Sequence, residues 1–150
     1  MLKRIAVLAS GGGSNLQSIL QHFATLGEER PGDVALVASD RGAAGALERG
    51  RAAGVTAVAM DKALRTSGLL SLLQEHAIDL VVLAGYLRFV PAEVTRAFRG
   101  RMVNIHPALL PAFGGEGMYG HHVHEAVIAR GARVTGCTVH FVDEGMDTGP

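Results

Sequence analysis

The sequence holds one cysteine, no tryptophan and no excess of charge of either sign. Cys137 has no partner within the chain, so an internal disulfide is excluded. Aromatic residues make up only 5%, which leaves few side chains on which nucleic-acid bases could stack. The 14 Lys and Arg residues balance the 14 Asp and Glu residues, so the net charge gives no electrostatic basis for binding nucleic acid or an acidic membrane. We therefore expect no nucleic-acid partner and no membrane partner.

Long apolar runs are also missing. Only the short run Ile5–Ala9 follows the N-terminal residues, too little for the apolar region of a secretory signal. No other run approaches the roughly 20 residues that span a membrane. We expect a cytoplasmic location. The residues around Cys137 read as a strand over Val134–Val142, so we expect its thiol to be buried and inert.

What the chain does contain is short apolar runs that alternate with helical patterns. Strands are expected at Ile5–Ala9, Asp33–Ser39, Val55–Met60, Asp79–Gly85, Arg101–Ile105 and Val134–Val142. Helices are expected at Leu16–Leu26, Ala43–Ala53, Ser67–Ala77 (opened by Ser67), Pro91–Phe98 and His122–Ala129. This alternation predicts an α/β fold, a Rossmann-like three-layer sandwich with a mainly parallel sheet in one domain over 1–150. Ligands of such sheets bind beyond the carboxyl ends of the strands.

Asn104 and His106 lie at the end of one of these strands. Being two residues apart, they point to the same side of an extended segment, and Pro107 ends the strand. Asn104 offers an uncharged amide donor, whereas His106 can carry or release a proton near neutral pH. A turn former beside a surface histidine is the simpler alternative. The pair nevertheless suits the chemistry of a polarised carbonyl group.

A glycine turn, Ser10–Asn15, follows the first strand and opens the first helix. Glycines let the backbone approach an anion closely, and the unpaired N–H groups of a helix N-terminus favour negative charge. The spacing fits neither the dinucleotide fingerprint nor a P-loop. We interpret the turn as a site for a phosphomonoester. The alternative is a helix that is simply capped by Ser14.

Three further segments carry polar groups. Gly85–Val90 could line a slot for a flat heterocycle, although locally an ordinary loop with core anchors fits better. In the acidic loop Asp143–Pro150, Asp147 has the most rigid setting, and its carboxylate could favour the protonated form of His106. His121, His122 and His124 are clustered but lack the cysteine or carboxylate spacing of a zinc site, so no metal is expected. His140 is interpreted as an ordinary strand residue.

Four motifs in this order resemble one family. They are Ser10-Gly11-x-Gly13-Ser14-Asn15-Leu16-Gln17, Leu83–Arg88, Asn104–Pro111, and Thr138–Val142 continuing through Asp147-x-Gly149-Pro150. Together they resemble the phosphoribosylglycinamide formyltransferase family, the folate-dependent glycinamide ribonucleotide transformylases of purine biosynthesis. The resemblance spans essentially all 150 residues. The Asn-x-His-Pro segment is shared with other formyl-tetrahydrofolate enzymes, whereas the glycine turn singles out this family.

The resemblance implies transfer of a formyl group from 10-formyltetrahydrofolate, the co-substrate, to the amine of glycinamide ribonucleotide. It implies small-molecule substrates and a monomer or homodimer. It also implies a cis peptide bond at Leu110–Pro111. The residues that it assigns are Asn104, His106 and Asp147 for catalysis; Gly12, Gly13, Ser14 and Asn15 for the substrate phosphate; and Leu87, Arg88, Phe89, Val90, Val142 and Asp143 for the folate.

Three alternatives remain beside this interpretation. A formyltetrahydrofolate hydrolase would use a related Asn/His/Asp site with water as the acceptor, but the glycine turn favours a phosphorylated acceptor. Methionyl-tRNA formylation fits less well, because the chain has neither a basic balance nor a tRNA-binding extension. Family members continue beyond the position of Pro150, so we expect this chain to lack a C-terminal strand and helix. For that reason an inactive nucleotide-binding fragment is the third alternative. The loop Phe113–Gly120 is longer and richer in glycine than in some members.

Overall fold

The computed structural model describes all residues, 1–150, and contains one six-stranded sheet with the strand order β3-β2-β1-β4-β5-β6. The strands are β1 (Lys3–Leu8), β2 (Gly32–Ser39), β3 (Thr56–Ala59), β4 (Leu80–Leu83), β5 (Met102–His106) and β6 (Thr138–Phe141). β1 to β5 are parallel, and β6 pairs antiparallel with β5. The mainly parallel sheet expected from the sequence is confirmed.

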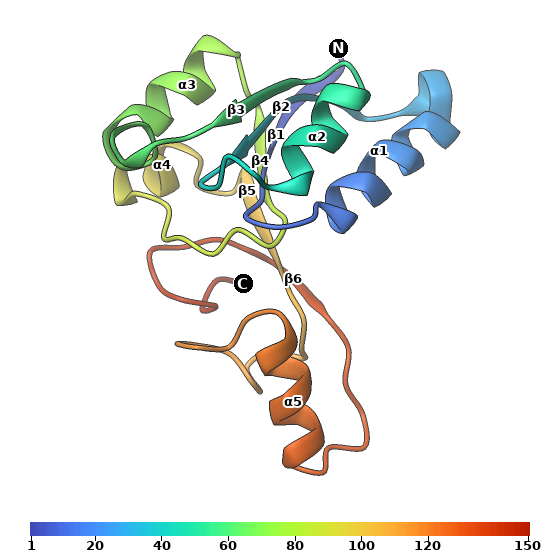
Figure 1. The fold of residues 1–150 in the computed structure, drawn as a ribbon, viewed down its shortest axis with the longest axis vertical. Helices are drawn as coiled ribbons and strands as arrows, with labels where there is room; N and C mark the ends of the chain where they lie inside the picture. The colour runs from blue at the N-terminus through green and yellow to red at the C-terminus, as the bar shows by residue number, and fades with distance from the viewer.

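Helices cover both faces of the sheet (Figure 1). α1 (Ser14–Leu26) and α2 (Gly45–Ala52) bury Leu16, Ala46 and Leu47 in the core of one face. α3 (Leu69–Glu75) and α4 (Ala92–Ala97) contribute Leu69, Leu73 and Val94 to the core of the other face. The 3₁₀ turn η1 (Gly27–Glu29) follows α1, and the π-helical turn η2 (Leu64–Gly68) leads into α3. The three-layer α/β sandwich is therefore confirmed.

The central strands form because their apolar residues are buried on both faces. In β1, Ala6, Val7 and Leu8 are completely buried. Alternate residues of this strand enter opposite cores: Ala6 and Leu8 lie in one and Val7 in the other. A fully buried Leu or Val side chain stabilises the fold by roughly 1.5–3 kcal/mol relative to an exposed one. Continuous apolar runs are typical of parallel strands covered on both sides.

The strand order creates a crevice between β1 and β4. From β1 the chain continues to β2 and β3 on one side of the sheet, and β4, β5 and β6 lie on the other side. At such a reversal, the loops after the two central strands diverge and leave room for a ligand. The loops after β1 and β4, which begin at Ala9 and Ala84, are therefore the ones that frame the crevice.

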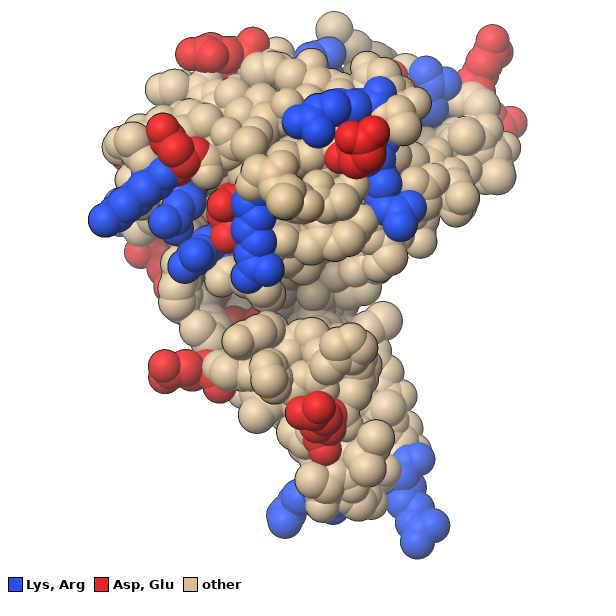
Figure 2. Space-filling view, viewed as in Figure 1, with Lys and Arg blue, Asp and Glu red and all other residues tan.

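The α5 helix (His121–Ala129) lies apart from the sheet layers (Figure 1, orange). Its buried face rests on a small core of its own, formed by Ala108, Val123 and Val127. Figure 2 shows that the surface narrows between the sheet body and the lower part that carries α5, and that basic and acidic side chains are intermixed on this face. None of the helices combines the length and the apolarity that a membrane crossing needs.

Two expectations about elements are wrong. β6 begins only at Thr138, so Cys137 precedes the strand and is exposed, because no layer covers residues 134–137. Ser67 does not open the third helix: its hydroxyl donates to the Ala63 carbonyl inside a helical turn that has already begun. The first turn is capped instead by Asp61, whose carboxylate accepts the Leu64 N–H at 2.8 Å. The peptide bond Leu110–Pro111 is cis, as the resemblance implies.

Candidate active site

A cavity of about 380 Å³ opens at the carboxyl ends of β4 and β5. Its wall includes all three residues expected to be catalytic, Asn104, His106 and Asp147. The wall also includes the complete set expected at the folate, which is Leu87, Arg88, Phe89, Val90, Val142 and Asp143. Residues from four separate parts of the chain thus meet at one concave surface.

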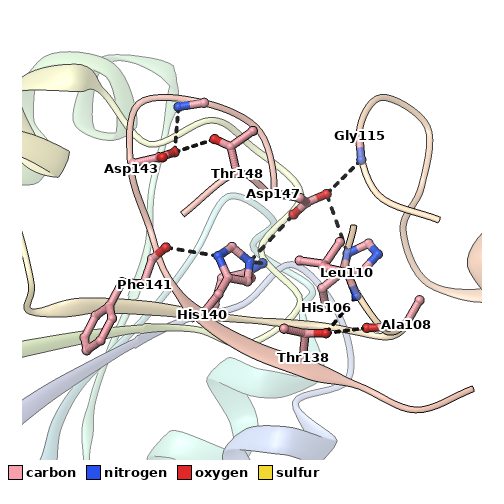
Figure 3. Close-up of polar contacts among 12 residues, drawn as sticks. His106, Ala108, Leu110, Gly115, Thr138, His140, Phe141, Asp143, Asp147 and Thr148 are labelled. Atoms are coloured by element: carbon pink, nitrogen blue, oxygen red, sulfur yellow. Dashed lines mark hydrogen bonds and ion pairs between the residues drawn. The ribbon is translucent and has the colours of Figure 1, made fainter. Parts of the chain in front are cut away.

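His106 is the most enclosed of the polar residues in this cavity, with only 3% of its side chain exposed. Its Nε2 lies 2.7 Å from the Phe113 carbonyl oxygen, a hydrogen bond in which the ring donates. Its Nδ1 lies 3.6 Å from Oδ2 of Asp147 (Figure 3). Both ring nitrogens therefore face an acceptor, an arrangement that a ring protonated at both nitrogens uses fully.

Asn104 does not contact His106 directly. Its Nδ2 lies 3.1 Å from Nε2 of His140, which is its cross-strand partner in the β5–β6 ladder. The Nδ1 of His140 donates to the Phe141 carbonyl at 3.0 Å, so Nε2 is the acceptor for the Asn104 amide. His140 is buried, lines the cavity and lies 3.8 Å from Oδ1 of Asp147.

His140 is thus a site residue that the sequence interpretation missed. The spacing of Thr138 and His140 matches that of Asn104 and His106, and antiparallel pairing sets the two pairs opposite each other. A sequence alone does not reveal that register, because it depends on how β6 returns along β5.

The acidic loop after β6 is folded tightly around its own carboxylates. Oδ2 of Asp147 accepts the Gly115 N–H at 3.1 Å, which connects this loop to the glycine-rich segment 113–120. Oδ1 of Asp143 accepts the Thr148 hydroxyl at 2.7 Å and the Gly145 N–H at 2.9 Å (Figure 3). These two hydrogen bonds, the one from Thr148 above all, hold the pKa of Asp143 below its usual value.

The segment after β4 supplies the apolar side of the cavity. Leu87 is 42% and Phe89 is 68% exposed, so their apolar surface at this side of the cavity is open to a ligand. Arg88, on the same segment, pairs with Asp40, which follows β2: Nε lies 3.0 Å from Oδ2. Burial alone would raise the pKa of Asp40, but hydrogen bonds from Ser10 and Arg88 outweigh it and hold this pKa below its usual value.

The glycine turn lies at the same edge of the sheet but does not line the cavity. Gly13 is the N-cap residue of α1 in the left-handed conformation (φ 78°), and no side chain caps the helix, so the simple capping role considered for Ser14 is wrong. The turn is held by α2, where the Arg49 Nε donates to the Gly12 carbonyl at 2.7 Å. The first N–H groups of α1 therefore remain available to an anion.

Chemically, the cavity offers an amide, two imidazoles and a carboxylate within one short network beside an apolar wall. No group of three or more His, Cys, Asp or Glu side chains is arranged to hold a metal ion. The amide and an imidazole N–H can donate hydrogen bonds to a developing oxyanion, and the imidazole and the carboxylate can transfer a proton. Cys137 is not part of the cavity.

A parallel sheet with converging polar groups and an apolar cavity at its carboxyl edge is the arrangement of α/β proteins that act on small molecules there. The sequence profile described as formyl transferase matches residues 3–150. A chloroplastic phosphoribosylglycinamide formyltransferase from Arabidopsis thaliana is 44% identical over 98% of this chain and 52% of its own. The chain belongs to the formyl transferase family.

Solved structures agree with this assignment. Glycinamide ribonucleotide transformylase 1 from Symbiobacterium toebii is 46% identical, with a TM-score of 0.88 over 99% of this chain and 70% of that one. A formyltetrahydrofolate deformylase from Pseudomonas syringae has a TM-score of 0.85 but is 26% identical, over all of this chain and 49% of its own. The chain spans about half the length of the plant relatives that it matches.

Proposed function

We propose that this protein transfers a formyl group from 10-formyltetrahydrofolate to the amine of glycinamide ribonucleotide, a step of de novo purine biosynthesis. The observation that carries the proposal is the single cavity that unites Asn104, His106 and Asp147 with the segments 87–90 and 142–143. The 46% identity to a glycinamide ribonucleotide transformylase supports this acceptor.

The neutral amine attacks the formyl carbon directly, so a new C–N bond forms and negative charge develops on the formyl oxygen. Collapse of this intermediate breaks the bond between the formyl carbon and N10 of the folate; the amine nitrogen loses one proton and N10 gains one, which releases tetrahydrofolate. Asn104 and His106 stabilise this oxyanion by donating hydrogen bonds to it. Nε2 of His106 is occupied by the Phe113 carbonyl, so Nδ1, which has no direct hydrogen bond, is the nitrogen that serves the reaction. Preorganised donors of this kind are each worth roughly 10²–10³ in kcat.

Asp147 assists by facing Nδ1 of His106 and by helping to move the proton released from the attacking amine. The 3.6 Å separation from Nδ1 exceeds a direct hydrogen bond, so the proton travels through a water molecule or after a small approach of the two groups. His140 keeps the Asn104 amide oriented through the 3.1 Å contact. No covalent intermediate on the protein is needed.

The folate lies against Leu87, Phe89 and Val90, with Arg88, Val142 and Asp143 at its polar groups. The phosphate of glycinamide ribonucleotide binds at Gly12, Gly13, Ser14 and Asn15, where the uncapped N-terminus of α1 offers backbone N–H groups. The substrate therefore extends from the glycine turn to the cavity across the crevice between β1 and β4. A cytoplasmic location, a monomeric or homodimeric state and a lack of metal remain predictions of this proposal.

The decisive experiment incubates the purified chain with 10-formyltetrahydrofolate in the presence and absence of glycinamide ribonucleotide. Release of tetrahydrofolate that requires the amine, together with a formylated product, is the expected result. Folate turnover that ignores the amine would identify a hydrolase instead. Binding of glycinamide ribonucleotide without any turnover would favour the inactive fragment.

The hydrolase is the second function to test, because the deformylase from Pseudomonas syringae shares the fold closely. Its 26% identity against 46% for the transformylase is the observation that ranks it below the transferase. The glycine turn separates the two functions physically, since water needs no phosphate site.

A further inference from the structure

Three loops at the carboxyl edge of the sheet are joined by one buried carboxylate. Asp40 follows β2, and its side chain is only 1% exposed. Its Oδ1 accepts the Ser10 hydroxyl at 2.6 Å, and its Oδ2 accepts the Arg88 Nε at 3.0 Å. Each oxygen of Asp40 thus serves a different loop.

Ser10 extends this connection to the backbone. Its Oγ accepts the Leu87 N–H at 2.9 Å, while its own N–H donates to the Gly85 carbonyl at 3.0 Å. Ser10 is 1% exposed and is the residue directly before Gly11 in the glycine turn. The loop after β1 and the loop after β4 are therefore tied together across the crevice, and Asp40 closes the network from β2.

Asp40 itself is not part of the cavity wall, whereas Arg88 and Leu87 are. The Arg88 side chain is 52% exposed, and only its Nε is used by Asp40. The remaining guanidinium nitrogens have no hydrogen-bond partner in the structure, so Asp40 fixes the direction of the arginine and leaves its outer donors for acceptor oxygens of a ligand.

We infer that Asp40 is a positioning residue. It fixes the segment 87–90, which we propose to bind the folate, relative to the glycine turn across the crevice, through Arg88 on one side and through Ser10 on the other. This inference rests on the proposed function for the names of the two ligands. It adds a residue that neither contacts the reacting atoms nor lines the cavity.

Two variants separate the two arms of the network. Asp40→Asn keeps the shape and an oxygen for the Ser10 hydroxyl, but it sets an N–H group against the Arg88 Nε–H. We expect the dissociation constant of tetrahydrofolate to rise roughly tenfold, as for the loss of one charge-assisted hydrogen bond. Ser10→Ala leaves the Arg88 pair but deprives the Leu87 N–H of its acceptor, and should weaken binding of both tetrahydrofolate and glycinamide ribonucleotide.

The matched control is Asp33→Asn. Asp33 lies near the start of β2, the strand that Asp40 follows, and also pairs with an arginine, Arg30, but at the far end of the strand from the site. This variant should bind both ligands as the parent does. Calorimetric titration gives the dissociation constant of each ligand for the parent and the variants, and steady-state kinetics gives their kcat and KM. A rise in KM for the folate with kcat within about twofold of the parent is the signature of positioning.

A double variant tests whether Asp40 and Ser10 act as one unit. Ser10→Ala combined with Asp40→Asn should bind tetrahydrofolate more tightly than the product of the two single losses predicts. Both variants release the same segment, since Ser10 holds the Leu87 N–H and Asp40 holds Arg88, and a segment that has already lost one contact loses less with the second. Ser10→Ala combined with Asp33→Asn should give the plain product. Multiplicative losses in both double variants would overturn the shared network.

The outcomes also separate this inference from the proposed function. If the parent chain binds neither tetrahydrofolate nor glycinamide ribonucleotide, the proposed function fails and this inference fails with it. If the parent binds both and Asp40→Asn matches it, only the positioning role is overturned. Should Asp40→Asn not fold, Ser10→Ala decides alone: parent-like affinity for tetrahydrofolate there overturns the inference.

Discussion

The two ring nitrogens of His106 have different partners, and this difference sets the role of the residue. Replacing His106 by Ala removes the Nδ1 donor beside Asp147 but leaves the apolar wall of Leu87 and Phe89 intact. We therefore expect His106→Ala to lower kcat by roughly 10²–10³-fold while tetrahydrofolate still binds. Single-turnover formyl transfer and calorimetric titration measure the two quantities.

The control for that experiment is His22→Ala, because His22 is exposed on α1 and distant in sequence from every cavity residue. It should leave both turnover and binding unchanged. Equal turnover in His106→Ala and the parent would rule out the assigned role of the imidazole.

Asp40 makes a second prediction at the scale of single residues, because its pKa is held below the usual value by Ser10 and Arg88 against the opposing effect of burial. The native state then binds fewer protons here than the unfolded state. The stability from Asp40 is complete above the unfolded pKa of about 3.9 and is lost as the pH falls through the lower folded value. The parent should lose unfolding free energy more steeply below about pH 4 than Asp40→Asn does.

Urea unfolding at a series of acidic pH values checks this, with Ser10→Ala as an intermediate case that lacks one of the two hydrogen bonds to Asp40. If the free energy of unfolding falls with pH equally steeply in the parent and in Asp40→Asn, the Asp40 carboxyl group has the same pKa in the folded and unfolded states, and the prediction is wrong.

Residue types and spacing predict that Asn104 and His106 share one side of a strand end and that Asp147 can reach His106, and in the structure Asp147 lies 3.6 Å from His106. The family resemblance is what groups the three as catalytic residues. Residue types and spacing were not enough to predict His140 beside Asn104. That contact depends on the antiparallel register of β5 and β6, which joins residues 36 apart in the chain. The same limit hid Asp40, whose partners come from two other loops.

Among the elements, the turn between β1 and α1 depends most on particular residues. At Gly13, φ is 78°, and an added Cβ would lie 2.7 Å from Cα of Ala46 on α2. Gly13→Ala should therefore lower the free energy of unfolding by at least about 1 kcal/mol from backbone strain alone, and by more from the clash. Urea unfolding of the variant measures the loss.

Gly11→Ala is the matched control two residues away. Nothing lies within 4 Å of an added Cβ at Gly11, and its backbone is outside the left-handed region. Its unfolding free energy should stay within about 0.5 kcal/mol of the parent. Equal losses in the two variants would mean that the close packing of this turn on α2 does not limit stability.

The first five strands are predicted well by the sequence. β1 to β5 all lie within about two residues of the expected positions, because a short apolar run bounded by turns has few other solutions. The predicted last strand is longer than the observed one. Val134 is followed by an alternation of polar and apolar residues that is typical of a strand, but its side chain is 77% exposed and it does not belong to the sheet. Alternation predicts a strand only where a neighbouring strand and a covering layer exist.

At the scale of the whole molecule, the sheet body and the segment around α5 differ in how they are stabilised. The sheet has an extensive core on each face, whereas α5 rests on Ala108, Val123 and Val127 with partial cover from Phe113 and Met118. The cavity lies between these parts, because Met118 and Tyr119 line it together with residues after β4. A ligand that fills the cavity contacts both the firmly packed part and the lightly packed part.

This difference predicts the pattern of amide hydrogen exchange. Regions with few buried apolar contacts open at lower free energy than the core strands. Amides of α5, including Val123 and Val127, should exchange much faster than those of Val7 and Val37 in β1 and β2. Tetrahydrofolate should slow exchange in 113–120, because Met118 and Tyr119 line the cavity in which we propose that it binds, and should leave β3 unchanged. Exchange followed by mass spectrometry gives both results, and α5 amides as protected as those of β1 would contradict the two-part description.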